Sequence, residues 1–179
     1  MEVAEQTITT NTSNIKVQKR DGRLEPLDID KIHFVVEEAC EGLTGVSSSQ
    51  IEINANIQFY DGITTKDIQH VLVKSANDLI SLENPNYQYA AARLLSYDVR
   101  KEAHGQYEYI PLLKLILRNI KLGVYDRTIV EKYHKSEIKK LNTWIKRDRD
   151  LDFTYAGLRQ VVDKYLSLIH IWRCRRMVA

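Results

Sequence analysis

The fold of the N-terminal half is decided by the stretch Val17-Gln18-Lys19-Arg20-Asp21-Gly22-Arg23-Leu24-Glu25-Pro26-Leu27-Asp28-Ile29-Asp30-Lys31-Ile32. It predicts a short strand, a tight turn, a second strand and the start of an amphipathic helix, because Gly22 can adopt the positive φ that the turn needs. Lys19 and Arg20 fall at the turn end of the first strand, and Lys31 falls in the first turn of the helix. Helix N-terminal amides favour anions, so the stretch suits phosphate, although solvated surface cations explain it equally well.

The composition is that of an ordinary globular protein. The chain has 179 residues, of which 44% are hydrophobic and 28% charged, and its net charge of +2 does not indicate a dedicated nucleic-acid binder. The sequence has no apolar run long enough for a bilayer and no signal-peptide core, so we expect a cytoplasmic protein without a membrane partner. Its two cysteines, Cys40 and Cys174, are too few for a disulfide framework or a zinc site, and we expect no bound metal. Cys40 is predicted to be a buried structural thiol.

The first hundred residues predict four helices and two or three short strands. The first helix follows the hairpin, and the second spans about 48–58. Asp61-Gly62 indicates a turn, Ile63 and Thr64 a short strand, and Thr65 the N-cap of a third helix that ends near Glu83. The fourth helix is predicted over about 86–104, with Gly105 as its stop. The expected fold is α+β but mostly α, a four-helix bundle capped by a small sheet.

The second half predicts an all-helical segment. Its helices are expected at 110–121, 127–133, 136–144 and 153 to about 165, with a charged connector at 146–150. We therefore divide the chain into a disordered lead-in (1–13), a sheet-capped bundle (14–105), a helical segment (106–165) and a tail (166–179). The tail resembles a translated transposase adapter, so we expect it to be non-native and the natural protein to continue differently beyond about residue 165.

Four groups of residues together carry a family resemblance. They are Lys19-Arg20-Asp21-Gly22, Asp30-Lys31-Ile32, Phe59-Tyr60-Asp61-Gly62-Ile63 with Thr65 and Asp67-Ile68, and Tyr87-Gln88-Tyr89-Ala90-Ala91-Ala92-Arg93-Leu94. In this order and spacing the chain resembles the N-terminus of the large subunit of aerobic class I ribonucleoside-diphosphate reductase. The likeness runs from about Ile15 to about Tyr165. It covers the ATP cone and the helical opening of the catalytic domain, including Asp148-Arg149-Asp150 with Phe153 and Tyr155.

The resemblance implies a regulatory nucleotide site. In that family the ATP cone binds ATP as an activator or dATP as an inhibitor, with or without Mg²⁺. Carried over position by position, the expected nucleotide contacts are Lys19, Arg20, Glu25, Pro26, Leu27, Asp28, Ile29, Asp30, Lys31, Thr65 and Lys101. The lysines, with Arg20 and Arg100, would neutralise the triphosphate, and Glu25 would accept from adenine or ribose.

Two further residues are candidate relays of the nucleotide state, Asp67 and Gln69. Asp67 also suits plain complementation of a helix N-terminus. Well-known members often have histidine where this chain has Gln69. ATP and dATP differ by one hydroxyl, so the loss of a polar contact would weaken discrimination, and inhibition by dATP stays open.

The resemblance also implies partners and an activity for the parent enzyme. That enzyme makes deoxyribonucleotides for DNA synthesis, receives its radical from a metal-bearing small subunit, and is expected to form homo-oligomers of the large subunit. The catalytic cysteines are not in this stretch, so we expect no catalytic residue here and no turnover by these residues alone. Three alternatives stay open: the ATP cone of a transcriptional repressor, that of an anaerobic reductase, and a helical interaction module without a ligand.

Overall fold

The computed structural model describes residues 15–166. The predicted lead-in over 1–13 and residues 167–179 of the predicted tail lie outside this range. Contacts divide the chain into two compact units, Met1–Leu94 and Leu95–Ala179. The sequence-based boundary at Gly105 stays a prediction, because helix α4 (Tyr87–His104) begins in the first unit and ends in the second.

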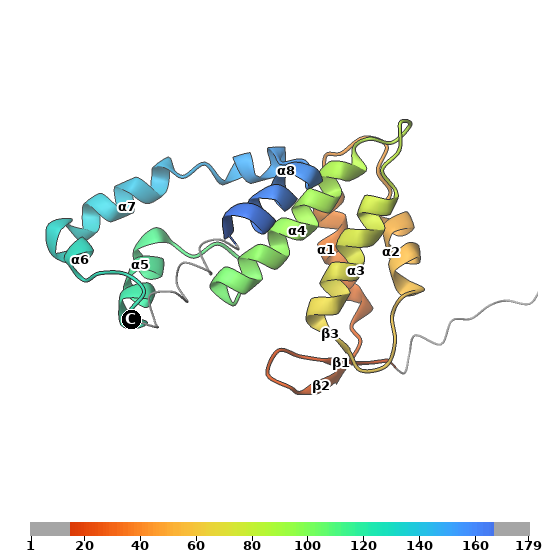
Figure 1. Cartoon of the computed structure of the whole chain (residues 1–179), viewed down its shortest axis with the longest axis horizontal. Coiled ribbons are helices and arrows are strands. Elements are labelled where there is room, and N and C mark those ends of the chain that lie inside the picture. Colours follow the sequence, from red (N-terminus) through yellow and green to blue (C-terminus); the bar gives the residue numbers. More distant parts are fainter. Residues whose placement is uncertain (1–14, 167–179) are drawn as a thin grey trace, which may run out of the picture. The chain divides into compact units, whose positions relative to one another are not determined.

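The first unit is mostly helical with a small sheet, which confirms the coarse form of the predicted fold. Figure 1 shows the sheet at one end of α1 and α3. The elements are β1 Lys16–Gln18, β2 Leu24–Pro26, α1 Ile29–Cys40, α2 Ser48–Asn56, β3 Ile63–Thr64, α3 Thr65–Asp78 and the start of α4.

The sheet has the strand order β2-β1-β3. β1 pairs antiparallel with β2, placing Val17 opposite Glu25, and parallel with β3, placing Val17 opposite Ile63. The turn between β1 and β2 closes through a bond from the Gly22 N–H to the Lys19 carbonyl at 2.9 Å, with Gly22 at φ 86°. The predicted hairpin is therefore confirmed, with glycine at the position that needs a positive φ.

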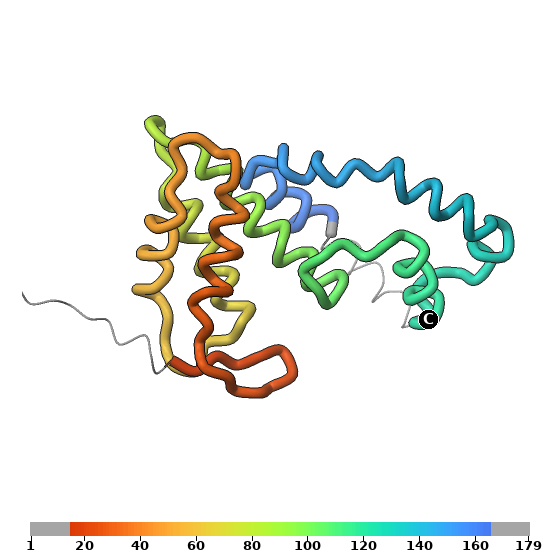
Figure 2. Tube along the Cα trace, turned by 180° about the vertical axis from the view of Figure 1, so that it is seen from behind, coloured from red at the N-terminus to blue at the C-terminus, as the bar shows by residue number. Residues whose placement is uncertain are grey.

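The core of the first unit lies between its helices. Ile51, Leu72 and Leu94 are almost completely buried, and full burial of such a side chain contributes roughly 1.5–3 kcal/mol. α1 contacts α2, and α2 contacts α3, and Figure 2 shows α1 and α2 running side by side. Alanines at 39, 55, 76, 90 and 91 are also buried and allow the helix backbones to approach closely.

Two details of α3 differ from the sequence prediction. The N-cap is Thr64 rather than Thr65, since the Thr64 Oγ1 accepts from the Asp67 N–H at 3.0 Å. The helix also ends at Asp78 instead of near Glu83, because the Ile80 N–H turns back to the Asn77 carbonyl at 3.1 Å. Ile80 therefore lies beyond the end of the helix, and its side chain is 38% exposed.

The second unit continues with short helices. They are α5 Leu112–Lys121, α6 Thr128–Lys132, α7 Lys135–Trp144, the 3₁₀ helix η2 Arg147–Asp152, α8 Tyr155–Gln160 and the π-helical turn η3 Val161–Leu166. α5 packs against α7, and the Asn142 Oδ1 accepts from the Leu112 N–H at 2.9 Å. Most of the charged connector predicted at 146–150 is ordered as η2.

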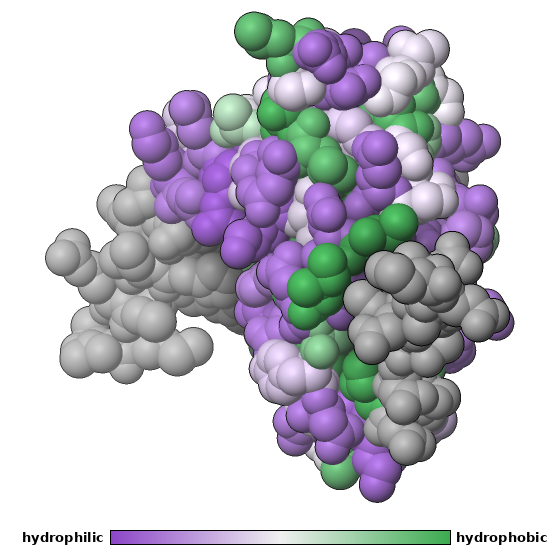
Figure 3. Space-filling model, turned by 90° about the vertical axis from the view of Figure 1, so that its right-hand side faces the viewer, coloured by the Kyte–Doolittle hydropathy of each residue, from purple (hydrophilic) through white to green (hydrophobic). Residues whose placement is uncertain are grey.

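The face drawn in Figure 3 is largely hydrophilic, with apolar patches between the polar side chains. Ile53 on α2 and Ile57, the C-cap residue of that helix, are 61% and 79% exposed. Within residues 15–166 we find no helix of the length and apolarity that a membrane crossing requires.

The capping of α3 gives a first prediction. Replacing Thr64 by Ala is expected to lower the free energy of unfolding by about 1 kcal/mol, because an orphan amide of the first turn loses its acceptor. Urea denaturation without nucleotide measures the change. Thr64→Ser keeps the oxygen and should stay close to wild type. An equal loss in Thr65→Ala would argue for the cap that the sequence predicted.

A second prediction concerns pH. The His33 Nδ1 on α1 lies 2.8 Å from the Glu52 Oε1 on α2, and its Nε2 lies 3.2 Å from the Glu37 Oε1. The hydrogen bond and charge of Glu52, then Glu37 and Asp30, raise the pKa of His33 above its ordinary 6.5. The stabilisation is therefore complete below pH 6.5 and is lost as the pH rises through the higher folded-state pKa.

Unfolding free energies of wild type and His33→Gln, measured across this interval, test the expectation. The wild-type advantage should shrink as the pH rises. A difference between the two proteins that does not vary with pH contradicts it.

Candidate functional site

The sheet brings two of the predicted nucleotide contacts to the same edge. β1 and β3 are parallel with Gln18 opposite Thr64, so Lys19 and Thr65, the next residues along each strand, leave the sheet in the same direction. The side chain of Lys19 is 33% exposed. A basic amine and the first residue of helix α3 therefore share one end of the sheet.

Acidic groups accompany the basic side chains of the hairpin. The Lys19 Nζ lies 3.2 Å from one Glu25 oxygen, and an Arg23 nitrogen lies 3.8 Å from the other. Arg23 also contacts Asp21, with a nitrogen to oxygen distance of 2.7 Å, which lowers the pKa of that carboxyl group. We call Lys19, Asp21, Arg23 and Glu25 the hairpin charge cluster.

The positive charge of Lys31 at the N-terminus of α1 is also paired with a carboxylate. Asp28 caps the helix, because its Oδ1 accepts from the Lys31 N–H at 3.2 Å, while its Oδ2 lies 2.7 Å from the Lys31 Nζ. The bond with Asp28, and to a smaller extent the charge of Glu25, raise the pKa of Lys31. The negative charge of Glu25 therefore attracts cations on both the hairpin and α1.

The other predicted contacts of this stretch lie along the same connection. Leu27 is half-buried, and its N–H donates to the Ile15 carbonyl at 2.9 Å, which extends the pairing of β1 with the chain after β2. The remaining members are exposed to solvent: Arg20, Pro26, Ile29 and Asp30.

The two candidate relay residues lie in the first turns of α3. Asp67 accepts a hydrogen bond from the Thr64 hydroxyl at 2.6 Å, so its carboxylate belongs to the cap of the helix. Gln69 is only 6% exposed, and its Nε2 donates to the Leu94 carbonyl of α4 at 2.9 Å. Gln69 thus joins α3 to α4 within the first unit, and its role as a relay stays a prediction.

Lys101 belongs to the second unit, in the last turn of α4. Its Nζ lies 5.9 Å from the centroid of the Tyr107 ring, within the range of a cation–π contact. Arg100, which the sequence also offers to phosphate, has its guanidinium carbon 4.4 Å from the centroid of the Tyr109 ring. For both residues a phosphate contact stays a prediction.

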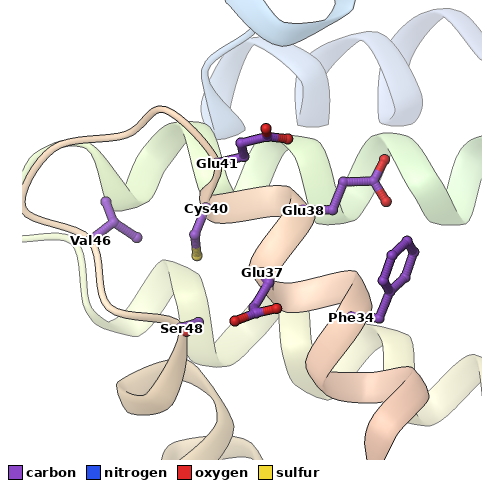
Figure 4. Close-up of a pocket in the computed structure, with 7 residues that line it drawn as sticks. All are labelled: Phe34, Glu37, Glu38, Cys40, Glu41, Val46 and Ser48. Atoms are coloured by element: carbon purple, nitrogen blue, oxygen red, sulfur yellow. The ribbon is translucent and has the colours of Figure 1, made fainter.

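A hollow on the first unit does not suit a triphosphate. It has a volume of about 610 Å³ and is formed by α1 and the chain before α2 (Figure 4). Burial raises the pKa of Cys40 to about 11, so the half-buried thiol stays protonated near neutral pH. The carboxylates of Glu37, Glu38 and Glu41 line the hollow and would repel a phosphate group. The lining residues are Phe34, Glu37, Glu38, Cys40, Glu41, Val46 and Ser48.

Sequence reasoning missed two residues that shape the site. Arg23 enters the hairpin charge cluster two residues before Glu25, and the period of two in an extended strand is the signal that could have placed both side chains on one face. The Asp61 Oδ1 accepts from the Lys16 N–H at 2.8 Å and so fixes β1 to the turn before β3. From sequence, Asp61 predicts only a turn, because the Lys16 N–H that its side chain binds lies 45 residues away.

No group of metal-ligating side chains is found within the part of the chain that the structure describes. The expectation that this chain's own residues bind no metal stays a prediction.

Comparison with known proteins agrees with this architecture. Residues 15–102 match the ATP cone domain family. The chain is 46% identical over 153 residues to "Ribonucleoside-diphosphate reductase 1 subunit alpha" of Escherichia coli K12, an alignment that covers 86% of this chain and 20% of the relative. It is 40% identical over 153 residues to the "Ribonucleoside-diphosphate reductase subunit alpha" of Haemophilus influenzae, again covering 86% and 20%. The Helicobacter pylori (strain J99) subunit is 39% identical over 152 residues, covering 85% and 19%.

The chain thus spans about a fifth of the length of the relatives it matches. With its match to the ATP cone domain family over residues 15–102, the chain is homologous to the N-terminal region of ribonucleoside-diphosphate reductase alpha subunits.

Proposed function

We propose that residues 15–102 bind ATP or dATP and act as an allosteric regulatory domain. The observation that carries the proposal is the shared sheet edge, where Lys19 and the start of α3 lie next to each other in a segment that matches the ATP cone family. Orphan amides at a helix N-terminus and a nearby lysine are suited to a phosphate group.

The ion pairs of the site would exchange when nucleotide binds. Lys19 pairs with Glu25, and Lys31 pairs with Asp28. A triphosphate carries more charge than either carboxylate and accepts several charge-assisted hydrogen bonds, so it would replace them as the partner of the lysines. The released Glu25 carboxylate could then accept from the adenine amino group or a ribose hydroxyl.

We further propose the finer architecture that the family implies. Helices α1 to α4 would form the four-helix arrangement of a cone over residues 14–105, and residues 106–165 would open a catalytic domain. Mg²⁺ bound to the triphosphate would supply further neutralisation without a protein metal site.

The proposed parent activity is reduction of ribonucleoside diphosphates to the deoxyribonucleotides used in DNA synthesis. The proposed partners are a radical-generating small subunit and further copies of the large subunit, in the cytoplasm. We assign no catalytic residue to the described chain, so its contribution is regulatory. A nucleotide shifts activity by its differential affinity for two subunit arrangements, typically ~1–3 kcal/mol.

Calorimetric titration of the 179-residue chain tests the nucleotide site. ATP and dATP are expected to bind saturably, and Lys19→Ala is expected to weaken binding about tenfold or more, the size of one charge-assisted contact. Lys74 lies exposed on α3 beyond its first turns, and Lys74→Ala is the matched control. Lys101→Ala reports whether the second unit contributes. No binding of either nucleotide at millimolar concentration would overturn the proposal.

A separate prediction concerns Gln69 as a relay. Gln69→Leu is expected to lower the free energy of unfolding by about 1 kcal/mol through its lost hydrogen bond, and to change the ratio of ATP to dATP affinities about threefold. Gln58→Leu is the control, because Gln58 also donates a side-chain hydrogen bond to a backbone carbonyl, at 3.0 Å, but lies after α2. An unchanged ratio in Gln69→Leu would leave Gln69 a purely structural residue.

A further inference from the structure

Aromatic and basic side chains gather after the last turns of α4. They come from three parts of the second unit: the second half of α4, the chain that follows it, and η2. We call them the Tyr–Arg cluster, defined as Tyr97, Arg100, Tyr107, Tyr109, Arg147 and Asp150.

Arg100 is the centre of the cluster. Its guanidinium carbon lies 4.7 Å from the centroid of the Tyr97 ring, 5.4 Å from that of Tyr107 and 4.4 Å from that of Tyr109. Its Nε is buried and has no hydrogen-bond partner among the described residues. The faces of three rings therefore supply much of the electrostatic compensation for this cation.

Tyr109 connects Arg100 to η2 in two ways. The guanidinium carbon of Arg147 lies 4.7 Å from the centroid of the same ring, and the Tyr109 hydroxyl donates a hydrogen bond to the Asp150 carboxylate. Burial, and then the bond to Asp150, raise the pKa of Tyr109 to about 12, so the hydroxyl keeps its proton at neutral pH.

η2 depends on such contacts for its order. It is a six-residue 3₁₀ helix with the sequence Arg-Asp-Arg-Asp-Leu-Asp, and 3₁₀ runs of that length are uncommon because their hydrogen-bond geometry is poor. None of its residues is buried in a core. Its order is therefore sensitive to the loss of the two connections to Tyr109.

α4 connects the cluster to the first unit. Its residues 87–94 belong to the first unit and its residues 95–104 to the second. Lys101 directly follows Arg100, and its Nζ also contacts the Tyr107 ring. A nucleotide that attracts Lys101 would therefore act on a side chain that contacts the Tyr107 ring and that follows Arg100 in the chain. This step rests on the proposed nucleotide-binding function.

We propose that the Tyr–Arg cluster is a clasp through which nucleotide binding to the ATP cone controls the order of residues 147–152. The two states of the device are η2 fastened to Tyr109 and η2 released from it. Nucleotide favours the fastened state by rigidifying the end of α4, and Tyr109 and Arg147 are positioning residues that contact no nucleotide themselves.

Hydrogen exchange of the whole chain, followed by mass spectrometry, tests the clasp. In wild type, saturating ATP is expected to slow exchange of peptides that cover 147–152 by about threefold or more. Arg147→Lys keeps the charge but loses the planar stacking on Tyr109, and Tyr109→Phe keeps the ring but loses the bond to Asp150. Both variants should bind ATP within about twofold of wild type, yet lose the slowing at 147–152.

Arg149→Lys is the matched control, because Arg149 is an exposed arginine of the same segment, and it should behave as wild type. Slowing at 147–152 that persists in both variants, or wild type that binds ATP without slowing there, overturns the clasp. Calorimetry on the same samples separates the two ideas: absence of ATP binding to wild type refutes the proposed function and the clasp with it. Loss of ATP binding in Tyr109→Phe with an unchanged circular dichroism spectrum also counts against the clasp.

Discussion

The pairing of β1 with β3 is the constraint on which the first unit depends. Val17 and Ile63 meet across it, and both side chains are nearly inaccessible to solvent. Both backbone groups of Lys16 are held by the turn before β3, through the Asp61 carboxylate and the Gly62 N–H. The pairing closes a loop of more than forty residues that contains α1 and α2, so those two helices acquire their positions only once it has formed.

The same pairing relates the basic hairpin to the start of α3. Without it, Lys19 and Thr65 would belong to separate segments with no fixed relation. Gln69 extends the connection inward, because one turn beyond the cap of α3 it reaches a carbonyl of α4. Lys19, Asp67 and Gln69 thus lie along one continuous path of strand, cap and helix contact within the first unit.

Local features of the fold could be predicted from sequence, and long-range ones could not. Gly22 and the apolar spacing of α1 are local signals, and both the hairpin and the helix are present. Thr64 and Thr65 are adjacent and chemically equal as caps, so only the backbone decides between them. The compensation of Lys19 by Glu25 depends on strand pairing. The ring contacts of Arg100 could not be predicted from sequence, because two of the rings, Tyr107 and Tyr109, come from beyond the end of α4.

The paired state of the basic residues bears on the kinetics of recognition. Lys19, Arg23 and Lys31 each have a carboxylate within 4 Å, so the site without nucleotide presents little net field to an approaching anion. Long-range steering then contributes little to the rate of encounter. Under the proposed nucleotide-binding function, selectivity would lie instead in the short-range exchange of partners, which only a polyanion that engages several lysines together can drive. Single phosphate ions in the surrounding solution would then compete poorly, and a nucleotide with its full triphosphate would have the advantage.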